Sequence, residues 1–318
     1  MFDALAILLL LGMMAASPFL ERIHNRFARL GLTLLALLIL AYLPMESRIW
    51  GFTLTAVGAL GMMVGSFRAL LSGELEGTME FSSLSHTGFI LLGIGLDNLM
   101  MHAGGIAANS VVLYMINYAV VETVIFLTVD ATVTGDCHVS LASIRGYGRR
   151  QKRLMIPFAL AGASLAGLPG LLGYVSKTLL HEGIVHMAEH APVWSVVLEV
   201  LFFLAGGCTA AYMVKLFVTL FIRRETTEEP GCIKAAPRKL VEVVYFPILL
   251  LTVLGVFPVL AERIGGFLTG SDISGTVPYF SFHCLRSVLI LIPLGVALSF
   301  VARGFLLLQK KWREKKQT

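Results

Sequence analysis

The chain contains few charged residues. Aspartate, glutamate, lysine and arginine make up 14% of its 318 residues, whereas soluble globular domains contain about 25%. Residues with apolar side chains make up 57%. This balance excludes an ordinary soluble domain. It predicts an all-α protein, a polytopic bundle of transmembrane helices with no soluble catalytic module.

Cysteine is also scarce, and its pattern excludes several classes of site. The four cysteines are isolated and never form a Cys-x-x-Cys pair, so we expect no iron–sulfur cluster or zinc ribbon held by this chain alone. A dinucleotide-binding fingerprint, a P-loop and a nucleophile elbow are missing as well. We therefore expect no cofactor and no catalytic chemistry in this chain alone.

Nine apolar stretches are candidates to cross a bilayer, which takes about 17–25 residues of helix. The second is short, and the sixth is too long for one straight crossing. The first could be a signal peptide, but no clear small-residue cleavage site precedes the basic loop after it, so we count it as a helix. The expected spans are Phe2–Leu20, Leu30–Met45, Phe52–Leu71, Ser82–Met101, Gly104–Val129, Ile156–His190, Val193–Ile222, Leu240–Leu260 and Ser287–Leu308.

Basic residues are distributed unevenly between alternate loops. Of the 25 lysines and arginines, 18 fall in the loops after the odd-numbered spans and in the C-terminal tail, and 3 fall in the loops after the even-numbered spans. Because cytoplasmic loops are rich in lysine and arginine, we expect an N-terminus outside and a cytoplasmic tail in a multi-pass protein of the plasma (inner) membrane. The net charge of +5 therefore does not indicate a nucleic-acid partner; the basic tail is expected at anionic lipid headgroups.

The sixth span contains a helix breaker and a lone lysine. Pro169 has no N–H to offer the carbonyl of Leu165, and Gly167, Gly170 and Gly173 allow the backbone to unwind. In lipid such a break survives only where protein or water satisfies the freed groups. Lys177 follows the break, and a lysine at the bilayer centre costs about 2.5–3.5 kcal/mol or more unless it is solvated or paired. A broken helix next to a buried charge is typical of ion sites in membrane proteins.

Glu122 is the second candidate for an interior charge. It lies on the same helical face as Tyr114 and Tyr118, at intervals of four residues. A polar stripe that ends in a carboxylate is expected to face the bundle interior, where a glutamate can take and release protons. The alternative is a side chain that reaches the cytoplasmic interface.

Two further candidates are weaker. His86 follows three serines at the start of the fourth span and could relay protons, but an interfacial or hydrogen-bonded neutral histidine is equally consistent with the sequence. Lys215 and Arg68 lie within about two turns of a cytoplasmic helix end, where a long basic side chain can extend to the headgroups.

The segment after Lys177 raises the question of a metal. His181 and His186 are separated by five residues, which leaves them roughly 140° apart around a helix and excludes the zincin arrangement. Glu182, His186 and His190 do share a face. We expect no metal; a wet outer end of the helix accounts for these side chains.

Three stretches, in order, resemble a known family: the antiporter-like, proton-conducting membrane subunits shared by respiratory complex I, Mrp-type sodium/proton antiporters and membrane-bound energy-converting hydrogenases. Residues 74–89 resemble Asp-aliphatic-Lys-Arg-x-x-Ala-Tyr-Ser-Ser-x-Ser-His-x-Gly-Phe, and residues 115–122 resemble x-x-Asn-His-Ala-x-x-Lys. Residues 144–148 followed by 167–177 resemble x-x-Gly-Leu-Gly … Gly-x-Pro-x-x-x-Gly-Phe-x-x-Lys. The resemblance covers roughly residues 50–220.

The chain departs from the family pattern at three positions. Glu76 stands in place of a lysine, Tyr118 in place of a histidine and Glu122 in place of another lysine, whereas Lys177 keeps the family's residue. Family members have about fourteen helices in two inverted repeats, each with a broken helix. This chain is similar to the second repeat alone. We expect two N-terminal helices outside the resemblance (residues 1–49), the antiporter-like repeat (50–222), and two C-terminal helices with a basic tail (223–318).

The resemblance implies a subunit of a redox-driven ion-pumping complex. Glu122, Lys177, Tyr118, His86 and Lys215 would contribute to a path for H+ or Na+. The partners would be other membrane subunits, of antiporter-like and hydrogenase or quinone-reductase type, which carry the redox chemistry. The alternatives are a non-conducting scaffold in the same kind of complex and a stand-alone transporter or membrane enzyme.

Overall fold

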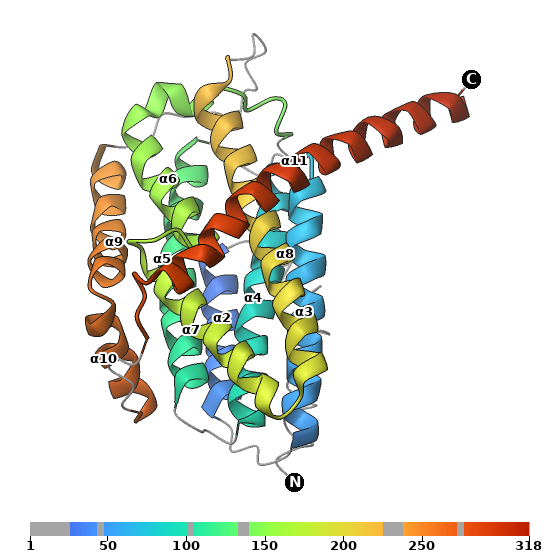
Figure 1. The fold of residues 1–318 in the computed structure, drawn as a ribbon. Coiled ribbons are helices and arrows are strands. Elements are labelled where there is room, and N and C mark those ends of the chain that lie inside the picture. Colours follow the sequence, from blue (N-terminus) through green and yellow to red (C-terminus); the bar gives the residue numbers. More distant parts are fainter. Residues whose placement is uncertain are drawn as a thin grey trace.

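A computed structural model describes most of the chain. The described residues form ten α-helices, labelled α2 to α11 (Figure 1), with two short 3-10 turns, η1 and η2, and one π-helical turn, η3. The described ranges are 26–42, 48–100, 105–132, 140–224, 238–271 and 277–317. The expected span Phe2–Leu20 lies outside them.

The ten helices account for the other eight expected spans, because two of those spans are broken. The bounds are α2 Arg26–Tyr42, α3 Arg48–Leu71, α4 Leu75–Leu99, α5 Ile106–Thr132, η1 Tyr147–Gln151, α6 Lys152–Ala166, α7 Leu172–His186, η2 Met187–Glu189, α8 Pro192–Phe217, η3 Val218–Ile222, α9 Arg238–Val256, α10 Pro258–Thr269 and α11 Phe282–Gln317.

Glycines allow α3 and α4 to approach backbone to backbone. A Cβ atom built on Gly88 would lie 2.2 Å from the Met62 nitrogen, and one on Gly58 would lie 2.4 Å from the Leu92 nitrogen. Small residues at such interfaces are typical of membrane helix pairs, where close van der Waals contact replaces the hydrophobic effect. The two helices form a closely packed hairpin on one side of the bundle (Figure 1).

The bundle turns its polar groups inward and its apolar groups outward. Side chains such as those of Ile49, Val193 and Phe267 are 77%, 79% and 88% exposed, whereas Glu122, Lys177 and His86 are buried. A soluble protein would not expose large apolar groups of this kind over a whole surface. The expected all-α, multi-pass membrane fold is confirmed.

Length and apolar composition identify the helices that can cross a bilayer individually. Four qualify among the described residues: Arg48–Leu71, Ile106–Val129, Pro192–Ile222 and Phe282–Ala302. The bent pair Glu242–Val256 and Pro258–Thr269 would be a fifth. The broken pair α6 and α7 lies among these helices in the bundle (Figure 1).

The eighth expected span is not one continuous helix. α9 ends at Val256, α10 begins at Pro258, and the two axes differ by 101°. Pro258 is the first residue of α10, where its missing N–H costs nothing. At Gly255 a Cβ atom would lie 2.2 Å from the Leu171 Cα atom, so α9 ends against the break between α6 and α7. A periodic apolar pattern does not reveal such a bend.

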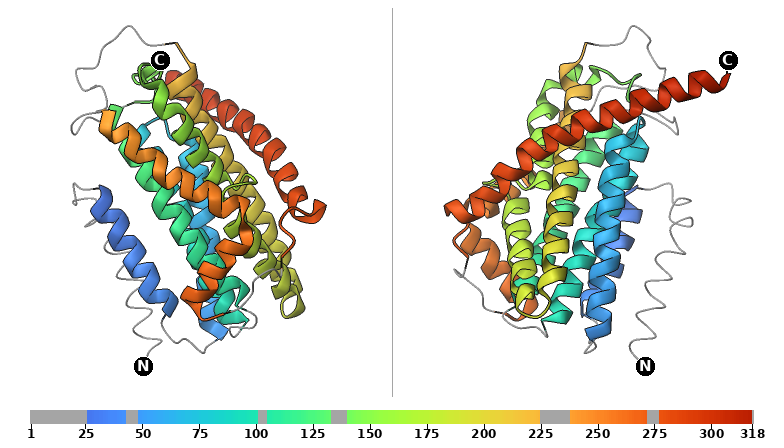
Figure 2. Two further views of the ribbon diagram at one scale, coloured as in Figure 1. Left: turned by 90° about the vertical axis from the view of Figure 1, so that its left-hand side faces the viewer. Right: turned by 45° about the vertical axis from the view of Figure 1, so that its right-hand side comes forward.

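The last helix crosses the bundle obliquely. Figure 2 shows α11 running across α8 and continuing beyond the other helices towards the C-terminus. Gly206 and Gly207 of α8 leave room for Leu291 and Leu294 of α11, whose side-chain atoms lie within 2.9 and 3.0 Å of Cβ atoms built on those glycines. The start of α11 thereby closes the side of the bundle next to α7.

Candidate functional site

A left-handed glycine ends α6 at the predicted break. Gly167 has φ +85°, and its N–H donates to the Ser164 carbonyl while the Leu168 N–H donates to the Ala163 carbonyl, both at 3.0 Å. This pair of bonds is the Schellman arrangement that closes helix C-termini. It leaves the carbonyl of Leu165 without its α-helical donor, since the residue four positions on is Pro169.

The Lys177 ammonium takes the place of the missing donor. Its Nζ donates to the Leu165 carbonyl at 2.6 Å and lies 4.9 Å from the centre of the Phe89 ring. The residue is 6% exposed. The break therefore both unwinds the helix and provides the partner of the buried lysine, with a cation–π contact in addition.

Two side chains and one backbone N–H connect the two halves of the broken helix. Ser164 on α6 donates to Asn117 Oδ1 on α5 at 2.6 Å and accepts from the Gly173 N–H on α7 at 3.2 Å. A Cβ atom on Gly173 would lie 1.8 Å from the Ser164 carbonyl oxygen. Only glycine permits this approach of α7 to α6, and so only glycine places Lys177 under Leu165.

His86 is the centre of a buried cluster of hydroxyl groups. Its Nδ1 lies 2.8 Å from the Tyr114 hydroxyl and its Nε2 lies 3.1 Å from the Tyr212 hydroxyl. Tyr212 also bonds Ser82 at 2.8 Å. These residues come from α4, α5 and α8. Each hydroxyl can donate or accept, so a proton can move along the cluster by rotation of O–H groups.

Glu122 is buried at the other side of this cluster. The carboxylate accepts a hydrogen bond of 2.8 Å from Ser83 and is also bonded by Tyr118. The ring of Tyr118 lies 5.5 Å from that of His86, centre to centre. Glu122 is 1% exposed. It therefore faces the interior, as the helical stripe predicts, and does not extend to the interface.

Glu122 and Lys177 do not form an ion pair with each other. Within the described ranges, Lys177 contacts the Leu165 carbonyl and Phe89, and Phe89 stacks on His86 with 6.1 Å between ring centres. Tyr118 then connects His86 to Glu122. The two charges are thus linked through an aromatic and hydroxyl-bearing layer, not by direct contact.

Lys215 lies apart from this cluster. Its Nζ donates to the carbonyls of Ala69, Leu70 and Ser72, at 3.0, 2.8 and 2.9 Å. These are carbonyls at and just beyond the end of α3, where a cation is favoured by the helix dipole. Arg68, also considered above, is exposed and lies over the Phe81 ring at 5.1 Å.

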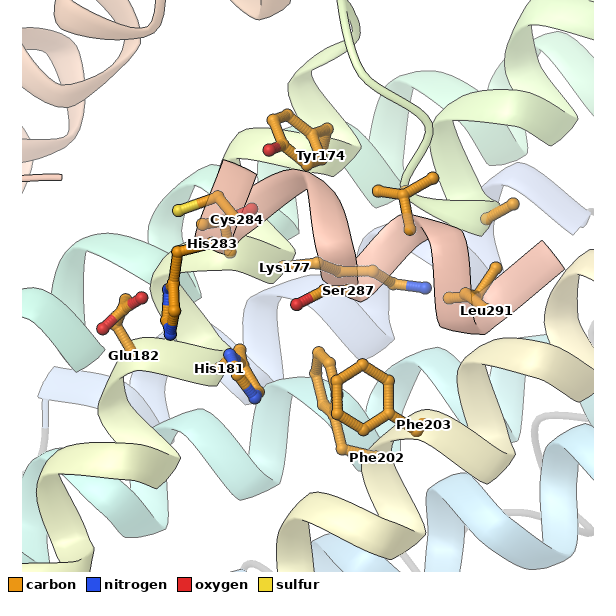
Figure 3. Close-up of a pocket in the computed structure, with 14 residues that line it drawn as sticks. Tyr174, Lys177, His181, Glu182, Phe202, Phe203, His283, Cys284, Ser287 and Leu291 are labelled. Carbon is orange, nitrogen blue, oxygen red and sulfur yellow. The ribbon is translucent and has the colours of Figure 1, made fainter. Parts of the chain in front are cut away.

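A small cavity of about 30 Å³ lies beside Lys177, room for about two water molecules. Figure 3 shows the Lys177 side chain extending along it, with His181 and the rings of Phe202 and Phe203 on the opposite wall. His181 Nε2 lies 3.1 Å from Glu199 Oε1. The residues of α11 that line it are His283, Cys284, Ser287, Val288 and Leu291.

Sequence reasoning missed several of these residues. Tyr212 and Ser83 gave no signal as partners, because a lone hydroxyl within an apolar helix is common. Glu262 is fully buried in α10 and accepts a hydrogen bond of 2.7 Å from Tyr279; an acid within the apolar run after Pro258 was its only sign. Glu182 lies with His283 and Cys284, not with His186 and His190.

Comparisons with known proteins identify the family. A model of the family described as "NADH:quinone oxidoreductase/Mrp antiporter, TM" matches residues 13–204. The chain belongs to this family. It is an antiporter-like membrane subunit, as the three sequence stretches predict. The matched range begins within the segment expected to lie outside the resemblance, and the proposed division at residues 49 and 222 stays a prediction.

Similar proteins include chain 4 of the NAD(P)H-quinone oxidoreductase of Prochlorococcus marinus (strain MIT 9312), which is 24% identical over 206 residues, 64% of this chain and 37% of that protein. An uncharacterized protein of Mycobacterium tuberculosis is 27% identical over 185 residues, 56% of this chain and 29% of that one. The chain spans less than two-fifths of the length of either relative.

Two solved structures share the fold. One is the Mrp complex from Dietzia sp. DQ12-45-1b, with a TM-score of 0.61 and 22% identity over 86% of this chain and 29% of the matched chain. The other is respiratory complex I from Thermus thermophilus with bound NADH, with a TM-score of 0.53 and 19% identity over 79% of this chain and 45% of the matched chain.

Proposed function

We propose that this subunit contributes part of a proton path, or a Na+ path, to a redox-driven ion-pumping complex in the membrane. The observation that carries the proposal is Lys177: a buried ammonium with one hydrogen-bond acceptor among the described residues, the Leu165 carbonyl, next to a cavity large enough for water. An ammonium has three donors. Two of them are left for cavity water or for an arriving acceptor.

The layer between Lys177 and Glu122 supports the same function. His86, Tyr114, Tyr212 and Ser82 form a continuous set of groups that both donate and accept. Glu122 adds an interior carboxylate. An arriving proton would change the charge at one end of this set and bias the other end electrostatically, which is the local event that such switches require.

The remaining parts of the proposal follow from the family and the charge pattern. Redox chemistry would belong to partner subunits, of antiporter-like and hydrogenase or quinone-reductase type. The chain would lie in the plasma (inner) membrane with its N-terminus outside and its C-terminal tail in the cytoplasm, since the basic loops are on that side.

A second function, a non-conducting scaffold that packs between other membrane subunits, is favoured by one observation. In the described part of the chain no carboxylate pairs with Lys177 and no cation pairs with Glu122. A scaffold needs the fold and the contacts but not the charges.

The experiment compares Glu122→Gln and Lys177→Ala in the assembled complex, reconstituted in sealed vesicles. Ion pumping is measured together with electron transfer. Exposed residues provide matched controls: Glu242→Gln on α9 and Lys152→Ala at the start of α6. We expect both interior variants to lower the ions moved per electron at least about tenfold, about 1.4 kcal/mol in the path's free-energy profile, with the controls unchanged.

Unchanged pumping in both interior variants would remove these residues from the path. If deletion of the chain then disperses the complex, the scaffold function is the correct one.

A further inference from the structure

The mouth of the Lys177 cavity holds a cluster of metal-ligand groups that the proposed ion path does not use. Glu182 on α7 and His283 and Cys284 at the start of α11 bring a carboxylate oxygen, an imidazole nitrogen and a thiol sulfur within 4.8 Å of one another. Figure 3 shows the three side chains grouped at one end of the cavity. Their chemistry is mixed, so the cluster is not an ordinary group of surface acids.

We propose that Glu182, His283 and Cys284 form a binding site for a borderline-soft divalent cation, in the first place Zn2+. Thiolate sulfur, imidazole nitrogen and carboxylate oxygen are the ligands that Zn2+ takes in proteins. A thiolate and a carboxylate at this spacing carry two negative charges, and a divalent ion neutralises both. Three protein ligands leave a fourth position for water, for which the adjoining cavity has room.

The distances are close to those a bound ion needs. Zinc bonds of about 2.0–2.3 Å place neighbouring ligand atoms of a tetrahedral site about 3.5 Å apart. Closing from at most 4.8 Å therefore needs movements of about 1 Å. His283 is exposed and Glu182 is partly exposed, so side-chain rotation provides these movements and the exposed imidazole gives the ion access.

The backbone on both sides of the cluster is already held in place. The hydroxyl of Tyr174 on α7 donates to the Tyr279 carbonyl at 2.5 Å, and the Tyr279 hydroxyl donates to Glu262 at 2.7 Å. These bonds fix the segment before α11 against α7 and α10. An ion would add a direct link between α7 and α11, and so rigidify one wall of the cavity that contains Lys177.

The test uses the full-length chain, purified through a tag that contains no histidine. Cys137, Cys208 and Cys232 are replaced by alanine in the parent, which leaves Cys284 as the sole thiol. Zinc per chain is measured by elemental analysis. Co2+, which occupies the same kind of site, is titrated while the thiolate-to-cobalt charge-transfer absorption is recorded. The variants are Glu182→Gln, His283→Ala and Cys284→Ser, with Glu189→Gln as a control on a nearby acid outside the cluster.

We expect one bound ion per chain in the parent and in the control, and a cobalt–thiolate band that Cys284→Ser abolishes. Glu182→Gln and His283→Ala should each weaken binding at least about tenfold, because even groups that only orient metal ligands contribute 10- to 100-fold. Zn2+ should also raise the melting temperature of the parent but not of Cys284→Ser, by mass action. Equal metal content in all variants, or Co2+ bound without a thiolate band, would overturn the proposal, as would a parent that binds neither ion. The readouts do not involve pumping, so they fail or succeed independently of the proposed function.

Discussion

Single residues of the site provide hydrogen-bond partners for polar groups that would otherwise be unpaired. Pro169 withholds a donor from the Leu165 carbonyl, and Lys177 supplies one from 12 positions away in the sequence. The Ser164 hydroxyl accepts from the Gly173 N–H at the start of α7 and donates to Asn117 Oδ1 on α5. Each partner removes an unpaired polar group from an apolar interior, where such a group costs about 1–3 kcal/mol.

Ser164→Ala tests the cost of an unpaired buried polar group at an uncharged residue. The variant leaves the buried Gly173 N–H and Asn117 Oδ1 without their common partner, so we expect a loss of about 1–3 kcal/mol in the free energy of unfolding. Thermal unfolding of the purified chain in detergent measures it. Ser299→Ala is the matched control, because among the described residues the Ser299 hydroxyl bonds only the Gly295 carbonyl one turn earlier in the same helix. We expect a loss of about 0.5 kcal/mol or less there. Equal losses in the two variants would show that the hydrogen bonds of Ser164 do not stabilise the junction between α6 and α7.

The sequence predicts the residues of the site better than their partners. The break at Pro169, the position of Lys177 after it and the inward face of α5 that carries Glu122 follow from local rules about proline, glycine and helical period. The bonds from Tyr212 to His86 and Ser82 connect positions 126 and 130 apart. Those depend on how α4 and α8 pack, which no local pattern specifies. The cluster of Glu182 with His283 and Cys284 was missed for the same reason.

Two helix ends in the structure depend on contacts with a neighbouring helix. The α6–α7 junction depends on the close approach of Gly173 to Ser164, and the end of α3 depends on the ammonium of Lys215. In both cases a residue of a neighbouring helix holds the helix end in place.

Gly173→Ala and Gly170→Ala separate close approach from backbone conformation. Gly170 has φ +85° and open space around it, so alanine there costs only the left-handed strain of about 1–2 kcal/mol. A Cβ atom on Gly173 would collide with the Ser164 carbonyl, so we expect a loss above about 3 kcal/mol, the upper end of ordinary overpacking. Melting temperatures of the two variants measure the difference. A Gly170 variant that is less stable than the Gly173 variant would contradict the geometry of the junction.

The charge of Lys215 has a structural role at the end of α3, although the residue is also a candidate for the ion path. Lys215→Met keeps the length of the side chain but removes the three hydrogen bonds to carbonyls at the end of α3. We expect a loss of about 1.5–3 kcal/mol in stability, as for hydrogen bonds from a charged donor. Lys215→Arg should recover most of it. If Lys215→Arg restores the melting temperature but not pumping in the assembled complex, then Lys215 acts in the ion path as well as at the helix end.

At the scale of the whole molecule, the fold places polar and apolar side chains in different regions. Polar groups of the site lie inside the bundle and large apolar side chains face outward, while most lysines and arginines of the sequence fall in alternate loops between the expected spans. The broken helix has residues of opposite charge at its two ends. α6 begins next to a basic segment at Arg149, and α7 ends at His186, close to the acidic Glu189.

The orientation of the chain follows from this arrangement and can be measured directly. The positive-inside rule predicts Arg149 in the cytoplasm and Glu189 outside, and both side chains are exposed. In a background with the four native cysteines replaced by alanine, Arg149→Cys and Glu189→Cys each provide one thiol. We expect a membrane-impermeant maleimide to label the Glu189 variant on intact cells, and the Arg149 variant only after the membrane is opened. The reverse pattern would invert the topology, and with it the side from which an ion reaches Lys177.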